Sequence, residues 1–227
     1  MFGLFKKKTP KPEFSEIREL LFADVPLSDW KPRDATPDAA GPWNDFEAAR
    51  LALGRGDTVS AVAALRRVVE VADVETRQSL QAWHCLRQLG VKPELNQGKR
   101  VLGVVLEVHL DDGLDTLAAY EDGSARYINH GGRAIVWEAK DERVSSLIAS
   151  LLGEGQRVAD VIGPWEEPRR PAPPRRHVRI NMLTPSGLHF GEGPLSVLSA
   201  DPMGGPVITA GTVLMQALIE RAERTTA

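Results

Sequence analysis

Cysteine and long apolar runs are scarce in this 227-residue sequence, and each absence excludes a class of protein. The single cysteine, Cys85, rules out an intramolecular disulfide framework and is typical of a reducing compartment such as the cytoplasm. No apolar stretch approaches the roughly 20 residues of a membrane-spanning helix. The net charge of −3 argues against electrostatic attachment of the whole chain to nucleic acid. We therefore expect a cytoplasmic protein without specific nucleic-acid binding.

Catalytic, cofactor and metal motifs are also missing. The segments GEGP and MGGP lack the spacing of phosphate-binding loops. The five histidines are not paired at metal-ligand spacing, and there is no Cys-x-x-Cys. His84 and Cys85 are adjacent on an apolar helical pattern, which favours core packing over a Cys-His catalytic couple. The sequence thus predicts no catalytic residue, no metal and no cofactor.

Residues 1–43 read as a proline-rich arm that is partly disordered. Only 14–22 has the spacing of a short amphipathic helix. Near the start, Phe2, Leu4 and Phe5 precede several lysines, which predicts a loose soluble tail. The alternative is a weak peripheral contact with a membrane through the same apolar tip and lysines.

Residues 44–97 have helical periodicity. Helices are expected from Asn44 or Asp45 to about Leu53, from Asp57 or Thr58 onward, and from about Val74 to Leu89. The stretch 48–70, with small residues around a Gly-Asp turn, resembles one tetratricopeptide-type helical hairpin. The family's usual tryptophan and tyrosine positions are unfilled and no second copy follows, so a repeat array is excluded. The resemblance implies a closely packed helix pair and a protein-binding habit.

Residues 98–227 form the predicted sheet domain. Alternating segments at 99–110, 114–121, 124–130 and 133–138 read as a four-stranded meander joined by two-residue turns. The prediction continues with a helix at 144–152 ending at Gly153, a proline- and arginine-rich crossing at 163–177, a hairpin at 177–193, and a helix at 207–224. The fold class is therefore α+β: a helical region followed by an antiparallel meander sheet with flanking helices. This order resembles profilin-like and longin-like scaffolds, which often bind partners or small ligands.

Strand register gives the first candidate site. Two-residue turns would set Glu107 opposite Ala118 and Tyr127, and would give the sheet one polar and one apolar face. The polar face would carry Glu107, His109, Thr116, Tyr120, Tyr127 and Asn129. The apolar face, which helices must cover, would carry Leu106, Val108, Leu117, Ile128, Ile135 and Trp137. The polar face could bind a ligand or partner, or it could simply face solvent.

The crossing gives the second candidate site. Its arginines, Arg169, Arg170, Arg175 and Arg176, could contact an anion or an acidic partner. Adjacent glutamates also fit a solvated linker. The preferred function is a non-catalytic cytoplasmic interaction or adaptor protein with an unidentified protein partner. The alternative is a small-molecule-binding domain or modest hydrolase that uses the polar face of the sheet.

Overall fold

The computed structural model describes residues 14–32 and 41–226. The predicted membrane contact of Phe2, Leu4 and Phe5 lies outside these residues. The helices are α1 (Phe14–Leu21), α2 (Pro42–Gly54), α3 (Thr58–Glu70), α4 (Thr76–Gln88), α5 (Leu95–Gly98), α6 (Glu142–Val161), α7 (Leu195–Leu198) and α8 (Gly204–Thr226). The strands are β1 (Gly103–His109), β2 (Leu114–Tyr120), β3 (Ala125–Ile128), β4 (Ala134–Trp137), β5 (His177–Thr184) and β6 (Gly187–Pro194).

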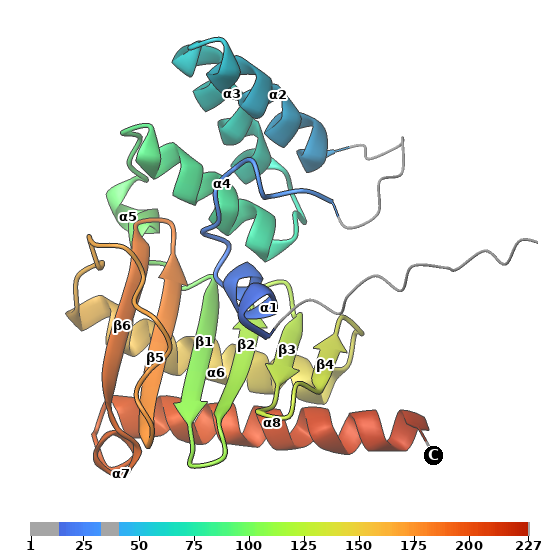
Figure 1. The fold of residues 1–227 in the computed structure, drawn as a ribbon, viewed down its shortest axis with the longest axis vertical. Coiled ribbons are helices and arrows are strands. Elements are labelled where there is room, and N and C mark those ends of the chain that lie inside the picture. The colour runs from blue at the N-terminus through green and yellow to red at the C-terminus, as the bar shows by residue number, and fades with distance from the viewer. Residues whose placement is uncertain (1–13, 33–40, 227) are drawn as a thin grey trace, which may run out of the picture.

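The strands of the described residues form one antiparallel sheet in the order β4-β3-β2-β1-β5-β6. The hairpin expected at 177–193 pairs through β5 with β1, so it extends the four-stranded meander to a six-stranded sheet (Figure 1). Helices precede and flank this sheet. The predicted α+β class is confirmed.

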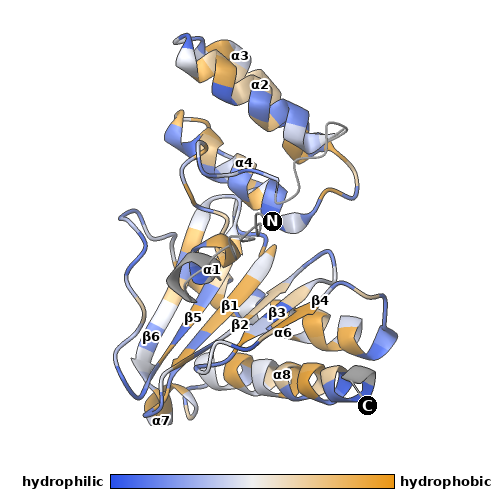
Figure 2. Cartoon of the chain, turned by 45° about the vertical axis from the view of Figure 1, so that its right-hand side comes forward, coloured by the Kyte–Doolittle hydropathy of each residue, from blue (hydrophilic) through white to orange (hydrophobic). Residues whose placement is uncertain are grey.

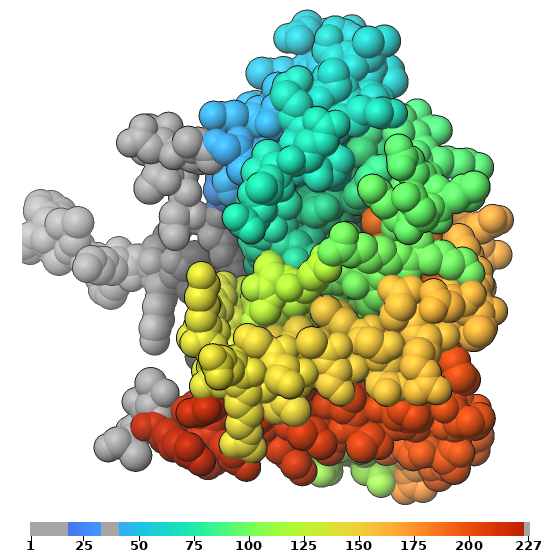
Figure 3. Space-filling view, turned by 180° about the vertical axis from the view of Figure 1, so that it is seen from behind, coloured from blue at the N-terminus to red at the C-terminus, as the bar shows by residue number. Residues whose placement is uncertain are grey.

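The back face of the sheet is covered by α6 and α8, which lie side by side (Figure 3). Apolar residues recur along the strands and along α6 (Figure 2). The core between them includes Leu106, Leu117, Ile148, Leu151, Ile180, Met182, Leu214 and Leu218. Glycines allow close helix–sheet packing here: a Cβ on Gly211 of α8 would lie 2.1 Å from Leu106 Cδ1.

The predicted end of the helix at Gly153 is wrong, because α6 continues to Val161. Neither glycine in the second half of α6 acts as a stop. Gly153 faces open space, whereas Gly155 lies against the sheet, where a Cβ would be 2.7 Å from Val104 Cγ2. Gly155 is therefore a packing residue, and the contact with β1 outweighs the low intrinsic helix propensity of glycine.

The helical region stands above one end of the sheet (Figure 1). Asp57 caps α3 by accepting a hydrogen bond from the Ser60 amide at 3.0 Å, as its position predicts. The turn between β2 and β3 joins this region to the sheet. There, Asp122 Oδ2 accepts a hydrogen bond from the Thr76 amide of α4 at 2.8 Å, and Thr76 Oγ1 accepts one from the Asp122 amide at 3.1 Å.

The described part of the proline-rich arm is packed into the protein. Leu21, Phe22 and Trp30 belong to the core shared by the helical region and the front face of the sheet. Side chains from both regions satisfy the arm's carbonyl groups: Tyr120 Oη donates to Leu21 O at 2.6 Å, and Gln81 Nε2 donates to Val25 O at 2.8 Å. The first part of 18–32 thus covers the sheet and the later part packs against α2 and α4, a structural role that their proline content did not predict.

The register differs from the prediction because the turns are longer than two residues. Tyr120 N donates to Ser124 O, so three residues lie in the turn between this hydrogen-bonded pair, and Thr116 pairs with Ile128. One extra residue places the next strand's side chains on the opposite faces. Tyr127 therefore lies on the back face and Ile128 on the front. The turn between β1 and β2 has two extra residues, so Glu107 pairs with Thr116 and both stay on the front face.

Candidate functional site

A charged strip crosses the front face of the sheet where the sequence predicts an open polar surface. Glu107 on β1 pairs in register with Arg179 on β5, which pairs with Glu192 on β6. Arg179 Nε donates to Glu192 Oε2 at 2.7 Å, and Arg179 Nη1 lies 3.6 Å from Glu107 Oε2. Asn181 Nδ2 also donates to Glu107 Oε2, at 3.2 Å. The Glu107 side chain is 0% exposed, so it is sealed from solvent.

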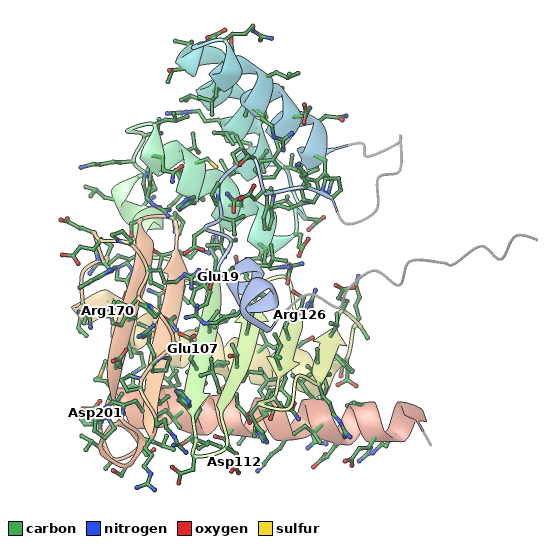
Figure 4. All side chains as sticks on the ribbon, viewed as in Figure 1. Glu19, Glu107, Asp112, Arg126, Arg170 and Asp201 are labelled. Carbon is green, nitrogen blue, oxygen red and sulfur yellow. The ribbon has the colours of Figure 1, made fainter. Side chains whose placement is uncertain are left out.

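Helix α1 lies in front of the Glu107 part of this strip (Figure 4), and the crossing lies against Arg179, which donates to Pro171 O at 2.6 Å. Its Arg18 donates from Nε to Glu107 Oε1 at 2.6 Å and pairs with Glu19 through Nη1 at 2.7 Å. Because a buried carboxylate is tolerated only when it is paired and hydrogen-bonded, Glu107 depends on Arg18 and Arg179 together. The charged strip therefore fastens an N-terminal helix to the sheet.

The crossing segment continues the chain of charges. Arg169 donates from Nε to Asp24 Oδ2 at 2.7 Å and pairs with Glu19 through Nη2. Its guanidinium carbon also lies 3.9 Å from the centre of the Phe22 ring. We call this continuous set the front ion network; in order along the contacts it consists of Asp24, Arg169, Glu19, Arg18, Glu107, Arg179 and Glu192.

The structure does not bring the six predicted face residues together. Glu107, Thr116 and Tyr120 are fully buried on the front face. His109 is at the far end of β1, where Nδ1 donates to Pro173 O at 2.7 Å. Tyr127 is on the back face. Asn129 lies outside β3 and accepts the Arg133 amide in the turn.

Tyr127 is satisfied within its own strand pair. Its hydroxyl donates to Asp115 Oδ2 at 2.8 Å. Burial raises the pKa of Tyr127, and the Asp115 carboxylate raises it further. Tyr127 therefore stays protonated at neutral pH and acts as a hydrogen-bond donor.

The four predicted arginine contacts divide into different environments. Arg169 is paired within the front ion network, and its side chain is only 10% exposed. Arg170 lies over the Trp165 ring, with its guanidinium carbon 4.8 Å from the ring centre. Arg175 and Arg176 are exposed and face Asp111, to which Arg176 donates from Nε at 2.8 Å. The four arginines thus interact mainly with carboxylates and aromatic rings of the protein itself.

Beside the network lies an open groove of about 1550 Å³, which we call the front groove. Four separate segments line it: 19–29 after α1, 80–99 around the end of α4, 164–169 of the crossing, and 183–188 around the β5–β6 turn. Helix α4 contributes Leu80, His84, Arg87 and Gln88. Their spacing places these four on one side of the helix.

Apolar side chains form much of the surface of the front groove. Phe22, Leu80 and Leu183 are buried within its walls. Leu188 and Trp165 are partly buried, and the Trp165 ring packs edge-on against Phe190, with centres 5.2 Å apart. At the rim, Leu95 is fully exposed. The groove thus offers apolar contact area that the described residues leave uncovered.

Two basic side chains of α4 face the front groove in different states. Burial lowers the pKa of His84, whose Nε2 lies 3.0 Å from Gln88 Nε2, so this imidazole is neutral at pH 7. Burial also lowers the pKa of Arg87, but an arginine remains charged at pH 7. Arg87 Nη1 donates to Pro185 O at 2.7 Å. The groove therefore contains a fixed positive charge.

Sequence reasoning missed the front groove. The sequence associates His84 only with the adjacent Cys85, and burial raises the pKa of that thiol, which fits a packed cysteine. The available signal was the spacing of Leu80, His84 and Arg87 along one helix. That signal does not show which distant segments face the helix, because four parts of the chain build the groove.

In comparisons with known proteins, no protein-family model, no curated protein and no solved structure matches the chain. Among residues 14–32 and 41–226, no group of three or more His, Cys, Asp or Glu side chains is placed to hold a metal ion. No helix in that same part of the chain is long and apolar enough to span a membrane.

Proposed function

We propose that this chain is a non-catalytic cytoplasmic interaction protein that holds a segment of a partner polypeptide in the front groove. The observation that carries the proposal is the groove itself, an uncovered, largely apolar channel of about 1550 Å³ between the helical region and the sheet. Pockets for single small ligands are typically about 300–1,000 Å³. The larger volume and open form favour an extended or helical peptide.

The groove is also held in shape before any partner binds. The front ion network fixes the segment 18–24 along one wall, and the Arg87–Pro185 hydrogen bond fixes the β5–β6 turn to α4. Preformed walls reduce the conformational entropy lost on association. The resemblance of 48–70 to a tetratricopeptide-type hairpin and the single cysteine support, respectively, the protein-binding and the cytoplasmic parts of the proposal.

Site-specific photo-crosslinking in the native cell tests this function. A photoreactive amino acid replaces Leu95 at the groove rim in one variant and Val197 of α7, which is 62% exposed at the opposite end of the sheet, in the other (Figure 1). We expect a discrete protein adduct from position 95 that position 197 does not give. Equal labelling from both positions would contradict the proposal.

A second substitution, made in the variant that carries the photoreactive residue at position 95, distinguishes the adaptor function from small-molecule binding. A Leu188→Asp substitution places a charge among the apolar groove side chains, and we expect it to abolish the adduct from position 95 while Val136→Asp, on exposed β4, leaves it unchanged. A metabolite retained in stoichiometric amount, with no protein adduct at position 95, would overturn the adaptor function in favour of small-molecule binding.

A further inference from the structure

Arg87 is the one arginine of the groove that the front ion network does not neutralise. Among the described residues, no carboxylate lies within ion-pairing distance of its guanidinium, which donates to the Pro185 carbonyl oxygen at 2.7 Å. The neighbouring negative charge of Asp24 is already bound by Arg169, at 2.7 and 3.0 Å. A partly buried guanidinium therefore faces the groove with unused donors.

The residue of β6 that lies next to the Arg87 guanidinium is a glycine. Gly187 begins β6 with φ +128°, a conformation that favours glycine. A Cβ at this position would lie 3.7 Å from Arg87 Nε. Because glycine has no side chain, nothing from this position contacts the Nε edge of the guanidinium. Such an edge binds a carboxylate with two parallel hydrogen bonds.

The rim of the groove carries more negative than positive side chains. Asp29, Glu94, Glu166 and Glu167 are exposed around it, against Lys92 and Lys99. A strongly acidic partner would be repelled by these carboxylates, whereas lysine or arginine residues on either side of a single acid would be attracted. The apolar side chains near Arg87, including Leu188, add a place for one hydrophobic anchor.

We propose that the front groove recognises a partner segment in which one Asp or Glu side chain pairs with Arg87, beside an apolar anchor and between basic flanks. This inference rests on the proposed function and specifies the chemistry of its partner. The central acid supplies the specific contact. The basic flanks improve the association rate and make it sensitive to salt.

A displayed library of short random peptides, selected on the full-length protein, tests the inference. We expect the selected sequences to share one acidic residue next to an apolar one, with basic residues outside them. A synthetic peptide from the selection should lose at least tenfold in affinity when its acid is changed to the amide, because a hydrogen-bonded pair with a charged group is worth about 1.5–3 kcal/mol.

Protein variants then locate the contact. Arg87→Gln should weaken the acidic peptide at least tenfold yet bind its amide analogue as the wild type does. The matched control, Arg100→Gln, removes an arginine that is 61% exposed outside the groove and should change neither affinity. Because the peptide substitution is measured on wild-type protein, the test does not depend on the folding of the Arg87 variant.

The possible results separate the two proposals. Selection of no peptide overturns the proposed function. Selection of peptides that compete for the groove but tolerate the acid-to-amide change, or that require a free C-terminal carboxylate instead, overturns the Arg87 inference and leaves the proposed function standing.

Discussion

The two faces of the sheet are covered by different means. On the back, α6 and α8 cover an apolar surface with apolar side chains. On the front, α1 and the crossing come from segments about 150 residues apart, and they meet through ion pairs such as Arg169–Glu19. The comparison shows that a polar sheet face can be as fully buried as an apolar one when its charges pair with a distant segment.

The back face should show the largest single-residue effect. Leu214 is 0% exposed, and Leu214→Ala should reduce the free energy of unfolding by about 2–5 kcal/mol, through lost apolar contact and the cavity left behind. Val213→Ala on the exposed side of the same helix is the control, with a far smaller effect. Denaturant unfolding measures both. Equal effects would show that α8 does not pack as described.

The front cover should show a smaller effect that depends on which arginine is removed. Arg169→Gln should cost about 1.5–3 kcal/mol, since it removes charge-assisted hydrogen bonds to Glu19 and Asp24. Arg175→Gln removes a 67% exposed side chain of the same segment and should leave the melting temperature nearly unchanged. A similar small change from both would mean that the crossing is a solvated linker.

The joint between the helical region and the sheet should show the smallest effect and a pH dependence. Burial alone would raise the pKa of Asp122, but hydrogen bonds from Thr76 and Ser124 hold it below its ordinary value. Asp122→Asn keeps only one acceptor oxygen and should cost about 0.5–2 kcal/mol at pH 7, as for a helix cap.

The sign of this dependence follows from the lowered pKa. The ionised Asp122 contributes its full stability above the ordinary aspartate pKa of about 4, and this contribution is lost as the pH falls through the lower folded value. The stability difference between wild type and Asp122→Asn should therefore shrink in acid. If the difference stays constant from pH 7 to well below the folded pKa, the effect of the substitution comes from the geometry of the side chain and not from its charge.

The sequence predicted the helices and strands better than it predicted which of their residues lie next to one another in the fold. Local signals placed the strands, the Asp57 cap and the final helix, because alternation and capping are properties of adjacent residues. Those signals also identified Glu107 as front-facing. They failed where a single turn residue decides the face, as for Tyr127, and where an interior glycine packs instead of ending a helix, as for Gly155.

The candidate site was harder to predict for the same reason. The front groove needs Phe22, Arg87, Trp165 and Leu188, which four distant segments contribute. No local pattern joins them. The polar residues that did form a pattern, Glu107 and Thr116, pair instead under α1 and are removed from solvent.

A double-mutant cycle on Arg18 and Glu107 tests most directly whether α1 is held on the front face by a buried ion pair. Arg18→Met and Glu107→Leu should each lower the free energy of unfolding by about 3 kcal/mol, because each removes the closest partner of a buried charge. Glu107 would keep only the longer contact with Arg179, and Arg18 only the more exposed Glu19. The double variant should lose less than the sum, by about 2 kcal/mol, since no such charge remains at that contact. If both single variants instead lie within about 0.5 kcal/mol of wild type, as for exposed pairs, the polar face is open to solvent and the account is contradicted.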